Sequence, residues 1–236
     1  PAKAVTGARI CVWLSFLGQL LLVPVILLYV CEWSMLDEGY HMQLHRTLGA
    51  ARATGLTEDG VESATHTLVE YLRGRRDSID LQAPVYGTAQ EVFNAREKAH
   101  MVDVKALFDG GRRIRAWLFA LGGLMVALGA MLAQKARAKR CNRARLTACC
   151  VWIGLLGALA LVCLIDFNAV FLRFHALFFD NDLWMLDPRT DLMIRLLPEP
   201  FFAAVASRTA LWMGIAVLAI PLASWASLWI WGDRTK

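Results

Sequence analysis

The sequence predicts an all-α integral membrane protein with four transmembrane helices and a mostly helical extracytoplasmic head. Two observations predict this fold class. Of the 236 residues, 57% are hydrophobic and only 19% are charged, whereas soluble domains have about 25% charged residues. The hydrophobic residues are also concentrated in four stretches without Asp, Glu, Lys or Arg, namely Ile10–Val30, Ala116–Gln134, Leu146–Ile165 and Thr209–Trp231.

Each stretch is long enough to cross a membrane. The hydrocarbon core is about 30 Å thick and an α-helix rises about 1.5 Å per residue, so about 20 apolar residues suffice. The first stretch is longer than the apolar region of a cleaved signal peptide, and no small-residue cleavage site closes it. We therefore expect it to remain as a transmembrane helix.

Basic residues predict the orientation of these helices. The connection between the second and third spans, residues 135–145, contains six basic residues and no acidic one. Because short cytoplasmic loops are rich in Lys and Arg, we expect this loop and both termini to be cytoplasmic. The pI of about 9.0 then reflects membrane topology, and we expect no nucleic-acid partner.

The chain divides accordingly into seven segments. They are the cytoplasmic N-terminus with the first span (1–30), an extracytoplasmic helical segment (31–115), the second span (116–134), the basic cytoplasmic loop (135–145), the third span (146–165), an extracytoplasmic loop with site residues (166–208), and the fourth span with the cytoplasmic C-terminus (209–236). Small residues on the second span, such as Gly122, Gly123 and Gly129, favour close helix packing over a groove for alkyl chains.

All five histidines, His41, His45, His66, His100 and His175, lie in the two predicted outer segments. We therefore expect acid–base chemistry on the extracytoplasmic face. His41 and His45 are spaced like a metal-binding pair, but no H-E-x-x-H motif accompanies them, so we expect no metal site there.

Two helices are predicted in the first outer segment. One runs from Thr57 to Arg73, with Gly74 as its stop. The other begins with the capping-box spacing of residues 88–91 and ends at the glycine pair 110–111.

The second of these helices carries a candidate site. Steps of three and four residues place Arg96, His100 and Asp103 on one face, and Glu97 lies one turn before His100. A carboxylate of Glu97 or Asp103 could fix the tautomer of His100, and Arg96 is a candidate donor to an oxyanion.

The second outer segment begins by extending the third helix beyond the bilayer. Five phenylalanines between residues 167 and 179, Phe174 among them, hold His175 near the lipid headgroups. Trp184, Asp187 and Asp191 follow in a segment rich in turn-forming residues. They are candidates for substrate binding or for turn structure and interfacial anchoring.

Two blocks of the sequence resemble the Lit-type family of bacterial membrane proteins, the lipoprotein intramolecular transacylases. The first block is residues 96–105 (REKAHMVDVK). The second is residues 174–179 (FHALFF), followed by Trp184, Asp187-Pro188, Asp191, Pro198-Glu199 and Phe201-Phe202. The resemblance and the plan of four spans together cover nearly the whole chain.

The resemblance implies an enzyme of the bacterial plasma membrane that acts on lipoproteins carrying a diacylglyceryl group on the N-terminal cysteine. The family moves the sn-2 acyl chain to the α-amine of that cysteine, which leaves the lyso-form lipoprotein. Its functional histidine pair falls on His100 and His175 here. We expect a monomer whose partners are the lipoprotein and membrane lipids, with no cofactor and no metal.

The chemistry of histidine suits this reaction. One of His100 and His175 would take the proton of the amine and return it to the leaving glyceryl oxygen, while the other donates to the oxyanion. An intramolecular transfer needs no acyl-enzyme, which agrees with the lack of a G-x-S-x-G motif.

Two other classes of function remain open. In a metal-dependent membrane hydrolase of lipid or lipoprotein esters, Glu97, His100, His175 and Asp191 would hold the metal. In a non-enzymatic lipid or lipoprotein binder, the aromatic residues and histidines would form a docking surface.

Overall fold

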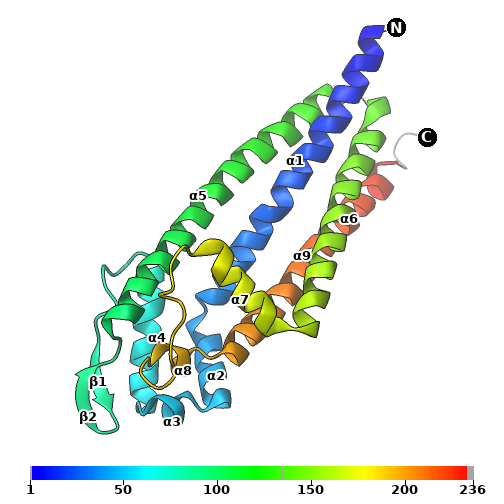
Figure 1. Ribbon diagram of the computed structural model, residues 1–236. Helices are drawn as coiled ribbons and strands as arrows, with labels where there is room; N and C mark the ends of the chain where they lie inside the picture. The colour runs from blue at the N-terminus through cyan, green and yellow to red at the C-terminus, as the bar shows by residue number, and fades with distance from the viewer. Residues whose placement is uncertain (1, 134, 233–236) are drawn as a thin grey trace. The chain divides into compact units, whose positions relative to one another are not determined.

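The computed structural model describes residues 2–133 and 135–232, and only the backbone of residues 2–8, 135–137 and 220–232. Gln134, the predicted end of the second span, lies outside the described residues. Within the described part of the chain, four helices are long and apolar enough to cross a membrane. They are α1 (Ala2–Met35), α5 (Ala95–Leu132), α6 (Lys135–Ile165) and α9 (Glu199–Gly232) (Figure 1). The predicted all-α fold with four membrane-spanning helices is confirmed.

Large apolar side chains on these helices point outward. Trp117 is 76% exposed, Met131 82% and Leu211 63%. Soluble proteins rarely expose such a contiguous apolar surface, whereas lipid tails solvate it. This surface is therefore the lipid-facing side of a membrane protein.

Two predicted boundaries are wrong. α5 continues through Gly110 and Gly111 without a break, because an interior glycine weakens a helix by only about 1 kcal/mol. Residues 135–145, predicted to form a loop, are the first turns of α6. They consist mostly of Ala, Lys and Arg, which are strong helix formers.

α5 is much longer than a membrane requires. Its 38 residues span about 57 Å at about 1.5 Å per residue, against a hydrocarbon core of about 30 Å. The charged residues of α5 all precede Ala116, so the first turns, which carry Glu97 and His100, lie outside the hydrocarbon core.

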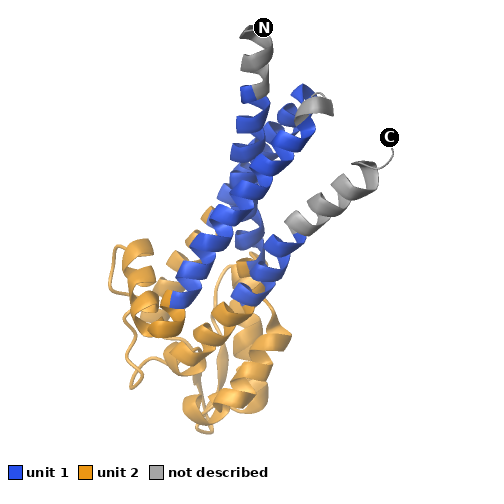
Figure 2. Cartoon of the chain, turned by 90° about the vertical axis from the view of Figure 1, so that its right-hand side faces the viewer, with its two compact units in different colours: residues 1–30, 111–161, 209–236 blue, residues 31–110, 162–208 orange. Residues whose placement is uncertain are grey.

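The chain forms two compact units (Figure 2). Unit 1 comprises residues 1–30, 111–161 and 209–236, and unit 2 comprises residues 31–110 and 162–208. A small core in unit 1 joins Val23 of α1, Cys149 of α6, and Met213 and Val217 of α9. The Trp152 indole also donates to the carbonyl of Leu20 at 2.9 Å.

Close packing of α1 and α5 within unit 1 depends on glycine. A Cβ atom added at Gly122 would lie 3.0 Å from the carbonyl oxygen of Gly18, and one at Gly129 would lie 2.9 Å from Oγ of Ser15. A Cβ at Gly123 would meet nothing within 4 Å. The predicted packing role of the small residues is thus confirmed for Gly122 and Gly129 and wrong for Gly123.

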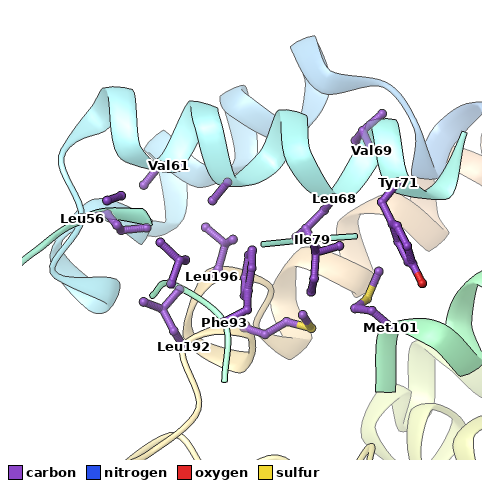
Figure 3. Packing of buried hydrophobic residues seen from close by; sticks show 14 of the residues in the cluster. Leu56, Val61, Leu68, Val69, Tyr71, Ile79, Phe93, Met101, Leu192 and Leu196 are labelled. Atoms are coloured by element: carbon purple, nitrogen blue, oxygen red, sulfur yellow. The ribbon is translucent and has the colours of Figure 1, made fainter. Parts of the chain in front are cut away.

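Unit 2 contains shorter elements: α2 (Glu38–Leu48), α3 (Ala50–Thr54), α4 (Glu58–Leu72), β1 (Gln82–Val85), β2 (Thr88–Glu91), α7 (Phe167–Phe178) and α8 (Met193–Leu196). Their core packs Val61 and Leu68 of α4 with Phe93, Leu192 and Leu196 (Figure 3). Phe93 and Leu196 are fully buried. The core therefore joins the segment before α5 to the segment around α8.

α4 agrees with the prediction. The Thr57 hydroxyl accepts from the amide of Gly60 at 3.0 Å and caps the helix. Arg73 is the C-cap, and Gly74 has a φ of 77°, which glycine adopts without steric cost.

Residues 88–91 do not begin a helix, so the predicted capping box there is wrong. They form β2, which pairs antiparallel with β1. Tyr86 and Gly87 connect the strands with φ angles of 51° and 81°, and positive φ at both central residues is the requirement of a type I′ hairpin turn. Pro84 disfavours a helix in the same region.

α7 is a separate helix and not an extension of α6, which corrects a further prediction. α6 ends at Ile165, and the carboxylate of Asp166 accepts from the amide of Ala169 at 2.9 Å as the N-cap of α7. A side-chain cap supplies the amide with a partner outside the helix, so the chain can change direction at this residue.

We expect Gly122→Val to lower the thermal unfolding temperature of the detergent-purified protein. The added side chain would collide with the backbone of α1, and overpacking of this kind costs about 1–3 kcal/mol. Gly123→Val is the matched control, because its site is open. Equal unfolding temperatures for the two variants would contradict the close packing of α1 and α5.

Candidate active site

His100 and His175 lie side by side in unit 2. His100 is in the second turn of α5, and His175 is in the last turn of α7. Their ring centroids are 6.2 Å apart and the ring planes differ by 34°. The structure therefore brings together the two histidines on which the sequence prediction rests, although 75 positions separate them in the chain.

The ring of His175 is oriented by a backbone carbonyl. Its Nδ1 atom lies 2.7 Å from the carbonyl oxygen of Phe171. A carbonyl oxygen only accepts hydrogen bonds, so Nδ1 must carry the proton. In the neutral ring, Nε2 then has the free lone pair and can act as a base.

Aromatic rings surround His175. The centroid distances are 4.3 Å to Phe171, 5.0 Å to Trp184 and 5.5 Å to Phe174. Phe174 and Trp184 were predicted site residues, and both contact the histidine. Burial among these rings lowers the pKa of His175, since desolvation disfavours the charged imidazolium.

His100 is more deeply buried, with 7% of its surface exposed, and its Nδ1 atom is buried without a hydrogen-bond partner. The pKa of His100 is lowered to about 4, mainly by burial and then by His175, while Asp103 acts in the opposite direction. Both histidines are therefore neutral at pH 7.

Phe179 contacts both histidines. Its ring centroid lies 5.2 Å from His100 and 5.6 Å from His175. Phe171 and Phe179 were not among the predicted site residues. The spacing of Phe171 and His175 by one helical turn is the sequence signal that could have identified Phe171.

Arg96 and Asp103 hold the segment that follows Phe179. The Arg96 guanidinium donates to the carbonyl oxygen of Asp182. The Asp103 carboxylate accepts from the side-chain amide of Asn181 at 2.9 Å. Asp103 thus acts on His100 through its charge, and Arg96 contributes by fixing the neighbouring segment.

Glu97 does not have the orienting role expected for it. Its carboxylate accepts from the backbone amide of Asn94 at 2.7 Å, and the Asn94 side chain accepts from the Glu97 amide at 3.0 Å. This reciprocal pair is a capping box at the start of α5. The other oxygen of Glu97 accepts from the amide of Met193. Glu97 is fully buried, and burial raises its pKa.

Asp191 is also buried and also organises the backbone. Its carboxylate accepts from the side chain of Asn94 and from the amide of Asp187, both at 2.7 Å. Asp187 itself is paired with Arg189, which lowers the pKa of Asp187 to about 2. Of the two readings open for these acids, the structure favours turn formation over contact with a substrate.

No three His, Cys, Asp or Glu side chains within residues 2–133 and 135–232 come together as a group that could hold a metal ion. Of the alternative metal ligands proposed from the sequence, Glu97 and Asp191 accept hydrogen bonds from backbone amides. His41 and His45 form a second histidine pair, buried against Phe201 at ring distances of 4.9 Å and 5.2 Å. Burial lowers the pKa of each to about 4.

The family model described as "Lipoprotein intramolecular transacylase Lit" matches residues 15–202. The chain belongs to this family. A comparison with curated proteins finds no match.

Solved structures of the family share the fold. One is the membrane integral lipoprotein intramolecular transacylase Lit from Bacillus cereus, with 19% identity and a TM-score of 0.70, covering 97% of this chain and 99% of that chain. A variant of the same protein with a histidine replaced by arginine has 18% identity and a TM-score of 0.72, covering 99% and 96%. A third structure has a histidine replaced by alanine, with 20% identity, a TM-score of 0.70 and 97% of both chains covered.

We expect Glu97→Gln to destabilise this member of the Lit family by about 1–3 kcal/mol, because the amide group of Gln can accept from only one of the two buried backbone amides. Thermal unfolding in detergent measures the effect. Glu62→Gln on exposed α4 surface is the control and should leave the unfolding temperature unchanged. A loss of activity without a loss of stability would instead favour the orienting role on His100.

Proposed function

We propose that this Lit-family protein moves the sn-2 acyl chain of a diacylglyceryl-cysteine lipoprotein to the α-amine of the same cysteine. The observation that carries the proposal is the pair of neutral histidines, with ring centroids 6.2 Å apart. The printed name of the family, lipoprotein intramolecular transacylase, supports the substrate class. The chain is a membrane protein, and the membrane supplies the lipid environment of the substrate.

His175 is the general base in this mechanism. The carbonyl of Phe171 fixes the proton on Nδ1, so Nε2 can take a proton from the attacking amine. The amine nitrogen forms a bond to the ester carbonyl carbon, and the bond from that carbon to the sn-2 oxygen breaks. The proton held by His175 then passes to the glyceryl oxygen.

His100 donates to the oxyanion of the tetrahedral intermediate. Its lowered pKa keeps it neutral, and a neutral imidazole has one N–H that can stabilise developing negative charge. The Nδ1 atom of His100 is buried without a hydrogen-bond partner. Within the described part of the chain, no acceptor therefore holds the proton on Nδ1, and Nε2 can carry the N–H that donates to the oxyanion.

The aromatic rings around the two histidines favour transfer of the acyl chain to the amine over its hydrolysis by water. Phe174, Phe179 and Trp184 contact the histidines, and apolar rings leave few positions for water. Exclusion of water also strengthens the hydrogen bond to the oxyanion, since the local dielectric constant falls.

We expect wild-type protein to convert a synthetic diacylglyceryl-cysteinyl peptide to an isomer of the same mass with one acyl chain on the nitrogen. Fragmentation mass spectrometry distinguishes the two isomers. His175→Ala should lower the rate by about 10²–10⁴-fold, as loss of a general base does, and His100→Ala by about 10²–10³-fold, as loss of an oxyanion donor does. His66→Ala, at a largely exposed histidine, is the control.

Other outcomes of the same experiment identify the other classes of function. Loss of one acyl chain from the peptide would show a hydrolase. Binding of the peptide without any change would show a binder, and either result would overturn the proposed transfer.

The pH dependence of the wild-type reaction tests the neutral state of the pair. The neutral amine reacts, so log(kcat/KM) should fall with a slope of one below about pH 7.7, the pKa of an α-amine. Burial lowers the pKa of both histidines, so the slope should steepen to two only below pH 6.5. A slope of two already at pH 6.5 would contradict the neutral state of the pair.

The orientation is part of the proposal. The basic residues at the start of α6 support a cytoplasmic position for residues 135–145 and both termini, and with this orientation we expect unit 2 to lie outside the cell. In a protein whose native cysteines, including exposed Cys31 of unit 2, are replaced by serine, we expect Thr88→Cys, on exposed β2, to react in intact cells with a thiol reagent that does not cross membranes, and Arg140→Cys not to react. The opposite labelling pattern would reverse the orientation.

A further inference from the structure

Three arginines lie at the edge of the apolar part of α5. Residues 110–119 contain Arg112, Arg113 and Arg115 and no acidic residue, and the charge-free stretch begins at Ala116. The arginines therefore lie where the hydrocarbon core meets the lipid headgroups. In the orientation proposed above, this edge faces outward, where basic residues are disfavoured. Binding of a ligand at this edge would explain why the three arginines are there.

Two of these arginines line an open groove of about 440 Å³ within unit 1. The wall formed by α1 consists of Val25, Ile26 and Tyr29, and α5 contributes Arg112, Arg115 and Phe119. The groove is thus basic at one end and apolar along the rest of its length. Its volume is in the range of small-molecule sites, about 300–1,000 Å³.

The side chains at the mouth of the groove fit an amphipathic ligand. Tyr29 is 61% exposed and Phe119 is 64% exposed, so the groove opens to the surface that lipid covers. The guanidinium of Arg115 lies 5.6 Å from the centroid of the Tyr29 ring, a cation–π contact that holds the positive charge at this mouth.

We propose that the groove binds a phospholipid with an anionic headgroup. The phosphate accepts hydrogen bonds from Arg112 and Arg115, and one acyl chain lies against Val25, Ile26 and Phe119. A guanidinium has five N–H donors in a planar fork that matches phosphate, so an arginine with a protein partner keeps donors for a lipid. The diacylglyceryl group of the proposed substrate carries no phosphate. This lipid is therefore a ligand separate from the substrate.

Native mass spectrometry of the detergent-purified protein tests the headgroup. We expect phosphatidylglycerol to bind more tightly than phosphatidylcholine with the same acyl chains. Arg112→Gln combined with Arg115→Gln should raise the Kd for phosphatidylglycerol about tenfold or more, since two charge-assisted contacts are lost. Arg113→Gln is the matched control: it is a neighbouring, exposed arginine outside the groove lining.

Three results would overturn the proposal. They are equal binding of the two lipids, equal Kd values for the double variant and the control, and displacement of phosphatidylglycerol by millimolar inorganic phosphate. The last result would identify a site for free anions, because a lipid held by its acyl chain as well is not displaced by a headgroup fragment alone.

Photo-crosslinking locates the acyl chain in the wild-type protein, so a folding defect of a variant cannot obscure the answer. A phosphatidylglycerol with a photoreactive group in one acyl chain should label peptides containing residues 25–29 and 112–119. Excess unlabelled phosphatidylglycerol should abolish this labelling. Labelling spread evenly over α1, α5, α6 and α9 would show a general lipid annulus and would overturn the site.

Discussion

The candidate site depends on two buried carboxylates that bind backbone amides. Glu97 caps α5 through Asn94 and also accepts from Met193, while Asp191 accepts from Asn94 and Asp187. These bonds attach the segment before α8 to the start of α5. Residues 180–191 contain little regular structure, so side-chain contacts must set their position. The contact of Trp184 with His175 follows from this attachment.

Burial determines the chemistry that the two histidines can perform. Charges near His100 act in opposite directions, since Asp103 favours its protonated form and His175 opposes it, but desolvation outweighs both. A protonated pair would repel at this distance and would have no lone pair to accept a proton. Two neutral rings can instead supply one lone pair and one N–H at the same time. Such a pair provides a base and an oxyanion donor without any change of net charge.

The sequence predicted the features that depend on hydropathy and local spacing. The spans follow from charge-free stretches, and α4 follows from Thr57 and Gly74, whose effects are local. The hairpin was missed because residues 88–91 have the same spacing as a capping box, and only the turn at Tyr86-Gly87 distinguishes the two. The contact of Glu97 with Met193 was also out of reach, because Met193 lies 96 positions away and no local pattern connects them, whereas the capping box of Asn94 and Glu97 is a local pattern that the sequence does carry.

Intramolecular transfer explains why histidines, carbonyls and aromatic rings suffice for the proposed reaction. The nucleophile is the amine of the substrate, so the protein needs a base, a donor to the oxyanion and a site that excludes water. Phe171 serves two of these needs, since its carbonyl fixes the tautomer of His175 and its ring covers the same imidazole. A change of the Phe171 ring would therefore admit water while leaving the base intact. Exclusion of water and proton transfer are thus separable properties of the site, and hydrolysis should replace transfer when only the first is lost.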